Sequence, residues 1–294
     1  MVLESLVRPK LAEQRPFRMI FLGILYASVA MYLSLWIFRE HASLVMVFLT
    51  VIASIPLMYH IIKYEEKKDL KKVKELFLLK EHSKALLAFI FLFIGFTFAF
   101  SMWYIFLPQG SVGDVFSLQT QTIQEINSRI TGLTVNAASV SSRYIFGQIV
   151  TNNLKVLLFC IFFSFFYGAG AIFILTWNSS VISAALGNFV RSHVSQYAGS
   201  FGFSQVANYF QVYSVGVIRY AIHGLPEMLS YFVGGLAGSI ISIAVIRHDF
   251  GTPQFKKVLF DSLDLILIAV GLVFVSGFIE VYITPAVFNL VFKA

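Results

Sequence analysis

Six stretches of the chain are almost entirely apolar, and each is long enough to cross a lipid bilayer as a helix. They cover residues 17–38, 42–62, 85–107, 152–176, 222–246 and 258–283. An α-helix rises about 1.5 Å per residue, so roughly 20 residues span the hydrocarbon core of a membrane. The pattern therefore predicts an all-α fold, a polytopic bundle of transmembrane helices.

Residues 63–84, between the second and third runs, are polar and rich in lysine. Within them Leu70, Val73, Phe77 and Leu78 recur at helical spacing, which predicts an amphipathic helix on the membrane surface. Such a helix either binds anionic lipid or is a solvated connector, and we favour the connector.

Lysine and arginine residues are concentrated in three segments beside the apolar runs: the N-terminal segment, residues 63–84 and residues 247–257. Positively charged loops stay on the cytoplasmic side of a membrane. We therefore expect a multi-pass protein of the cell membrane with a cytoplasmic N-terminus. Residues 108–151, which hold few positive charges, then lie outside.

The outer segment of residues 108–151 contains its own helical pattern within residues 119–134. Its apolar positions are spaced by three and four residues: Ile123, Ile126, Ile130 and Leu133. This spacing predicts an amphipathic helix on the outer face. The helix either covers the polar cluster around Glu227 and Glu280 or binds an extracytoplasmic partner, and we favour the cover.

The predicted orientation requires one further crossing within residues 177–221. No clean apolar segment exists there, because one short run ends at Arg191 and the next carries Arg219. We predict a broken crossing, with a short helix from Asn178, an irregular stretch at residues 197–203 and a second short helix. Irregular backbone at membrane depth needs protein or water around it. This gives seven crossings and an outer C-terminus; the alternative is six crossings with a re-entrant segment.

Composition agrees with a membrane protein, since 58% of the residues are hydrophobic and only 13% are charged. The net charge of +7 lies mostly beside the apolar runs. It therefore reflects topology, and we expect membrane lipids and no nucleic acid as partners. The single cysteine, Cys160, excludes disulfides as an organising principle. The first apolar run is too long for a signal peptide, so no cleavable leader is expected.

Polar side chains gather at one end of several apolar runs. Arg219, His223 and Glu227 are four residues apart, so they share one helical face. If the last two runs are antiparallel, Glu280 lies at the same depth as Glu227. The cluster predicted near the outer leaflet comprises His223, Glu227, Glu280, Arg219, Asn152, Asn153 and Asn178. Ionisable groups at membrane depth usually have a partner or a function. The cluster is either a structural latch or a ligand, proton or ion site.

Small residues predict close helix packing at two places, at Gly168 and Gly170 and at Gly234 and Gly238. Small residues such as glycine let helices approach closely in lipid. We expect packing within the chain in preference to a dimer interface.

No catalytic template is recognisable in the chain. It has no His-Glu-x-x-His zinc motif, no Gly-x-Ser-x-Gly elbow and no phosphate-binding loop. His223, Glu227 and Glu280 offer metal-ligand chemistry, but His–Glu pairs within a helix are ordinary. We therefore expect no catalytic residues, no metal and no cofactor, and we favour a non-enzymatic function.

Several short motifs occur in an order that resembles the stage II sporulation protein M family. They are Asn152-Asn153-Leu154, Gly168-x-Gly170, Trp177-Asn178, His223-Gly224-x-x-Glu227, Ile279-Glu280 and Thr284-Pro285. The resemblance covers about residues 85–285. It implies a five-crossing core in residues 85–294, with an outer polar loop at residues 108–151. Residues 1–84 then form an added pair of helices with a basic cytoplasmic connector.

The resemblance also implies a role in a membrane complex, because sporulation members of the family act with cell-wall-degrading partners during engulfment. One departure is Ser179, where the family usually has glycine. We predict an integral membrane scaffold or partner-binding subunit that engages other membrane or extracytoplasmic proteins. The alternative is a transporter, channel or lipid-handling protein that uses the polar cluster as its substrate, proton or ion site. An intramembrane hydrolase with Glu227 or Glu280 as base is the least favoured reading.

Overall fold

The computed structural model describes residues 15–69, 75–125, 142–164, 169–194, 203–246 and 251–287, and within these ranges its regular structure is helical. The predicted all-α class is therefore confirmed for this part of the chain. The long helices are α3 (Arg18–Ile37), α4 (Ala42–Asp69), α5 (Glu75–Phe106), α8 (Ser142–Ser164), α9 (Ala169–Val194), α10 (Phe203–Ile246) and α11 (Pro253–Phe278). Shorter elements are the 3-10 helix η1 (Arg39–His41), α6 (Gln109–Val115) and the π-helical segment η3 (Ile279–Ile283).

Six helical segments in the described ranges are long and apolar enough to cross a membrane. They are Arg18–Ile37, Arg39–Ile61, Lys84–Phe106, Ser142–Ser164, Ala171–Val194 and Phe255–Val287. The prediction of a multi-pass membrane protein is therefore confirmed. In addition, α10 is 44 residues long, which corresponds to about 66 Å of helix.

The prediction that residues 152–176 form one crossing helix, the fourth, is wrong. α8 ends at Ser164 and α9 begins at Ala169, so the apolar run is divided between two helices. Hydropathy could not locate this boundary because the sequence is apolar on both sides of it. Gly168, predicted to pack helices together, falls between the two helices and lies outside the described residues.

The predicted short helix starting at Asn178 is also wrong. α9 passes through Asn178 without interruption and continues to Val194, and α10 begins at Phe203. The predicted irregular stretch at residues 197–203 lies outside the described residues, apart from Phe203 itself. Arg191, which suggested that the apolar run had ended, is instead accommodated near the end of a long helix.

Arg191 is accommodated because it satisfies the last carbonyl groups of α5. Its guanidinium donates to the carbonyl oxygen of Ile105 at 3.1 Å, to that of Leu107, and to the side chain of Gln109. The final carbonyls of a helix have no partner within the helix, and a cation there also interacts favourably with the helix dipole. The arginine therefore holds the ends of α5 and α9 together.

α9 runs parallel to α5. Thr97 of α5 is hydrogen-bonded to Ser179 at 2.9 Å, and Ser183 donates to the carbonyl oxygen of Thr97. Further along, Arg191 meets Ile105, so residue numbers rise together on both helices. α5 and α9 therefore point in the same direction across the bundle.

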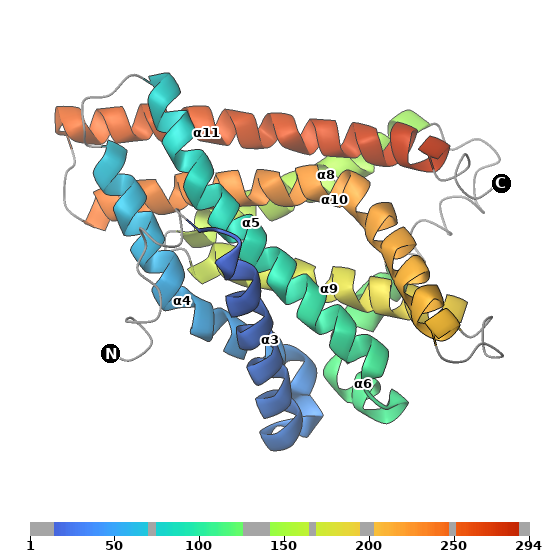
Figure 1. The fold of residues 1–294 in the computed structure, drawn as a ribbon. Helices are drawn as coiled ribbons and strands as arrows, with labels where there is room; N and C mark the ends of the chain where they lie inside the picture. Colours follow the sequence, from blue (N-terminus) through green and yellow to red (C-terminus); the bar gives the residue numbers. More distant parts are fainter. Residues whose placement is uncertain are drawn as a thin grey trace.

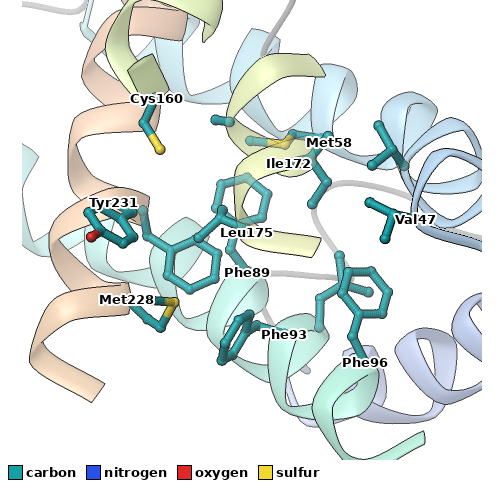
Figure 2. Close-up of a cluster of buried hydrophobic side chains, with 14 of the residues drawn as sticks. Val47, Met58, Phe89, Phe93, Phe96, Cys160, Ile172, Leu175, Met228 and Tyr231 are labelled. Atoms are coloured by element: carbon teal, nitrogen blue, oxygen red, sulfur yellow. The ribbon is translucent and has the colours of Figure 1, made fainter. Parts of the chain in front are cut away.

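α10 forms the centre of the bundle, where α4, α5, α8, α9 and α11 all contact it. Tyr231, Leu236, Ala237 and Ile240 of this helix are completely buried. Figure 2 shows Met228 and Tyr231 of α10 beside the α5 side chains Phe89 and Phe93, with Cys160 on the neighbouring α8. The core is therefore continuous from helix to helix, and α10 organises it.

The N-terminal helices α3 and α4 pack onto this bundle and share its hydrophobic core. α3 approaches α5 closely at Gly23, where an added Cβ would lie 2.5 Å from the carbonyl oxygen of Leu92. Trp103 of α5 also donates to Ser28 of α3 at 3.0 Å. α3 is therefore fixed to α5 by backbone proximity as well as by a side-chain hydrogen bond.

The prediction of a separate amphipathic helix across residues 63–84 is wrong for the residues that the structure describes. Residues 63–69 continue α4 and residues 75–84 begin α5. The predicted helix at residues 119–134 is present in part, because residues 117–125 are helical. The remainder of that prediction, residues 126–134, lies outside the described residues.

α6 and the helical residues 117–125 together form a polar surface that we call the platform. Gln119, completely buried, accepts a hydrogen bond from Ser43 of α4 at 2.7 Å and donates to Ser180 of α9 at 3.1 Å. Arg39 of η1 pairs with Asp114 of α6 at 2.8 Å. The platform is therefore tied to the N-terminal helices as well as to α9. Figure 1 shows α6 beyond the end of α5.

Candidate functional site

His223 and Glu227 lie in the middle of α10, whereas the sequence predicted that a helix begins there. α10 runs from Phe203 to Ile246 with Pro226 inside it. Figure 1 shows α10 as two arms that meet at an angle. A proline inside a helix removes one backbone hydrogen bond and is the usual cause of a sharp bend. His223 and Glu227 therefore flank the proline at the point where the central helix changes direction.

Glu227 receives a hydrogen bond from its own helix. The hydroxyl of Tyr231 donates to its carboxyl group at 2.9 Å, and Tyr231 is completely buried. Ser230 additionally donates to the backbone carbonyl of Glu227 at 2.7 Å. Tyr231 was not among the predicted site residues. The spacing of four residues that grouped His223 with Glu227 would also have identified it.

Glu280 lies on η3, the π-helical segment that follows α11 and contacts α10. One turn earlier, Ser276 of α11 donates to the backbone carbonyl of His223 at 3.2 Å. A π-helical turn widens a helix locally and often occurs at functional positions. The structure therefore brings His223, Glu227 and Glu280 to one contact between α10 and α11.

α8 contributes Asn153 to the same region of the bundle. Asn153 is 95% buried, and Asn152, which is exposed, donates to its side-chain oxygen at 3.5 Å. The Nδ2 atom of Asn153 has no hydrogen-bond acceptor among the described residues. Val150 and Leu157, on the same face of α8, lie against Gly277 of α11 and Gly234 of α10 respectively. Asn153 therefore faces the junction of the three helices.

Two of the predicted cluster residues stand apart from this junction or cannot be placed in it. The amide of Asn178 donates to the carbonyl of Ile174 at 2.8 Å, within its own helix α9. Arg219 belongs to α10, but its side chain lies outside the described part of the structure. The polar site described here consists of His223, Glu227, Tyr231, Glu280 and Asn153.

The polar site combines two carboxyl groups, a phenol, an imidazole and an amide. Across the described ranges, no group of three or more His, Cys, Asp or Glu side chains is placed to hold a metal ion. Two carboxylates near each other in a medium of low dielectric constant repel strongly whenever both are ionised. Their spacing and charge therefore affect how α10 and α11 pack against each other.

Gly234 and Gly238 lie where α10 crosses α8. A Cβ added to Gly238 would lie 2.6 Å from the carbonyl oxygen of Ile161, and one added to Gly234 would overlap the side chain of Leu157. This close approach places Asn153, on the same face of α8, at the depth of Glu227. Gly170 lies in α9, but its packing lies outside the described part of the structure.

Two apolar cavities lie on either side of the α10 bend. The larger, of about 380 Å³, lies between α5, α9 and the first arm of α10. The smaller, of about 310 Å³, lies between α5, α10 and α11. Phe93, Leu225 and Met228 line both cavities, whereas Glu227 is not among the described residues that line either.

The sequence profile of the stage II sporulation protein M family matches residues 85–285. The chain belongs to this family. The match begins in α5 and ends just after η3, so it includes the whole polar site of this stage II sporulation protein M family member and leaves α3 and α4 outside. Comparisons with curated proteins and with solved structures found no significant match.

Proposed function

We propose that this protein is an integral membrane scaffold, a partner-binding subunit of a membrane complex, and that the platform is its binding surface. Membership of the stage II sporulation protein M family supports a role in a membrane assembly. The polar site at the α10 bend is, in this proposal, a latch that fixes the packing of α8, α10 and α11.

The proposal places the platform outside the cell. Lysine-rich segments at the end of α4 and the start of α5 favour the cytoplasmic side. α5 then leads outward to the platform, and α9 leads outward because it is parallel to α5. α10 must return the chain inward before α11 crosses again. We infer seven crossings, with α10 as the sixth and an outer C-terminus.

The observation that carries the proposal is the anchoring of Gln119. A connecting loop needs no buried side-chain network, yet both ends of the Gln119 amide are satisfied by hydroxyl groups from two different helices. Such buried polar networks position a segment rigidly when every member has a partner. Gln121, Gln124 and Glu125 lie at or near the exposed side of the same short helix, and they present polar groups in a fixed arrangement.

The contacts of Glu227 support a latch in preference to a transport pathway. Its carboxyl group accepts a hydrogen bond from the hydroxyl of Tyr231, and the neighbouring backbone carbonyl of His223 accepts one from Ser276 of α11. The two cavities beside it have a mostly apolar lining, with no charged side chain among the lining residues, and such a lining solvates an ion or a proton carrier poorly. Buried polar groups persist when they are hydrogen-bonded, and they then restrict packing to one arrangement.

Site-specific crosslinking tests the proposal. A photoreactive amino acid replaces Gln124 on the platform and, as the matched control, the exposed Lys256 at the opposite end of the bundle. In native membranes we expect the same partner protein to be crosslinked from position 124 and not from position 256. Equal capture from both positions, or capture from neither, would contradict a specific binding surface on the platform.

A further inference from the structure

The larger cavity at the α10 bend has the chemistry of a hydrocarbon site. Three of its lining side chains carry hydroxyl groups: Thr97, Tyr213 and Tyr220. The hydroxyl of Thr97 is hydrogen-bonded to that of Ser179 at 2.9 Å, and the hydroxyl of Tyr213 is hydrogen-bonded to that of Ser101 at 3.1 Å. The remaining lining is aliphatic or aromatic. A ligand in this cavity therefore meets apolar surface.

The cavity opens sideways from the bundle. Four of its lining residues are large hydrophobic side chains that remain exposed on the surface: Ile94, Phe98, Val217 and Leu225. Two of them belong to α5 within Lys84–Phe106, a segment long and apolar enough to cross a membrane. The mouth of the cavity therefore faces the hydrocarbon of the bilayer.

An apolar space of this kind is unfavourable when empty. Its lining atoms lack van der Waals partners on one side, and water does not compensate because the lining offers it no hydrogen bonds. The cavity volume of about 380 Å³ is at the small end of the range for ligand pockets. It suits one flexible chain and excludes a whole lipid with its headgroup.

We propose that one acyl chain of a bilayer phospholipid occupies this cavity and supports the bend of α10. The chain enters between α5 and the first arm of α10 and packs against Gly224, Leu225 and Met228. It fills the space that opens where the first arm of α10 diverges from the central bundle. This site does not involve the platform, so its test is independent of the test of the scaffold proposal.

Gly224 provides a direct way to close the cavity. It lines the cavity, and a Cβ added there would meet no other atom within 4 Å. A larger side chain at this position can therefore enter the cavity without displacing backbone. Gly271 of α11 is a matched control, since an added Cβ there also meets nothing within 4 Å and it lines neither cavity.

The test uses the full chain, reconstituted in phosphatidylcholine vesicles in which a fraction of the acyl chains carry a diazirine. After illumination, mass spectrometry measures labelling of residues 93–98 and 213–228, relative to labelling of the exposed Phe21 on α3. We expect Gly224→Phe to lower this ratio severalfold and Gly271→Phe to leave it unchanged. An unchanged ratio in Gly224→Phe would show that these residues contact only bulk lipid and would overturn the proposal.

A second variant covers the case in which Gly224→Phe does not fold. Val217 lies at the mouth of the cavity and is 38% exposed, so Val217→Trp narrows the entrance from the surface. Its labelling ratio should also fall severalfold, whereas Gly224→Ala, which fills little of the space, should stay close to the parent protein. A parent-like ratio in Val217→Trp would contradict entry of an acyl chain by this route.

Discussion

Gln119 accepts a hydrogen bond from Ser43, which lies 76 residues earlier in the chain, at 2.7 Å. Ser43 belongs to α4, one of the two helices that precede the family match at residue 85. Arg39, just before α4, pairs with Asp114 of the platform. The added N-terminal helices therefore do more than enlarge the bundle, because they hold the platform in place.

Ser43→Ala should destabilise the protein by about 1–3 kcal/mol, because it leaves the buried side-chain oxygen of Gln119 without its donor. Thr122 is the matched control, since its hydroxyl donates to the carbonyl of Leu118 in its own helical turn and to no other residue that the structure describes. Thr122→Ala should change stability little. The measurement is the melting temperature of the purified protein in detergent, and equal losses in both variants would argue against a special role for Ser43.

Tyr231→Phe should destabilise the protein by about 1 kcal/mol, since it removes the hydroxyl that donates to Glu227. Tyr282→Phe, at an exposed position, should have little effect. In a double-mutant cycle with Glu227→Leu, the two changes should couple by about 0.5–3 kcal/mol, because they remove the same interaction. Additive losses would mean that the latch does not depend on this hydrogen bond.

Gly238→Ala should loosen the contact between α8 and α10, because the new Cβ would lie 2.6 Å from the backbone oxygen of Ile161. Overpacking of this kind typically costs about 1–3 kcal/mol. Gly271→Ala on α11 meets no neighbouring atom and should stabilise the helix by up to about 1 kcal/mol. Melting temperatures that move in opposite directions would support the packing described, and a tolerated Gly238→Ala would contradict it.

Arg191→Ala should destabilise the junction of α5 and α9 by about 1.5–3 kcal/mol, because it removes charge-assisted hydrogen bonds to the last carbonyls of α5. Arg191→Lys should restore part of this loss, since it keeps the charge but not the forked donor geometry. Arg39→Ala breaks an exposed ion pair and should cost less than about 1 kcal/mol. Amide hydrogen exchange at the end of α5 measures the effect locally.

The topology can be measured with an impermeant thiol reagent in a variant that lacks Cys160. Gly110→Cys, on α6, should be labelled from outside intact cells, and Lys256→Cys only after the membrane is permeabilised. A cysteine at Ala294 should react like the one at position 110. Labelling of positions 110 and 256 from the same side would contradict the arrangement of helices that places the platform outside.

The sequence predicted the membrane class and most helices because those properties depend on long apolar runs. It misplaced the boundary between Ser164 and Ala169 because apolar residues continue on both sides of it. It ended a crossing too early near Arg191, because the partners of that arginine, the carbonyls of Ile105 and Leu107, are distant in the sequence.

The sequence pointed to the two acidic residues of the polar site, but it did not reveal the hydrogen bonds of that site. Glu227 lies on α10 and Glu280 on η3, and these two elements contact each other, but a site shared by the two carboxyl groups stays a prediction. Asn178 was also predicted to belong to the site, whereas its amide donates to the carbonyl of Ile174 within α9. Gln119 was missed because its importance depends on Ser43 and Ser180, which only tertiary packing brings together.

The most direct measurement of the central claim is the yield of crosslinked partner from position 124 when the platform is loosened. Gln119→Leu removes the buried hydrogen bonds to Ser43 and Ser180, while Gln148→Leu, at an exposed site on α8, is the matched control. The scaffold account predicts a severalfold loss of crosslinked partner with Gln119→Leu and an unchanged yield with Gln148→Leu. Equal yields in the two variants, at equal protein levels in the membrane, would contradict it.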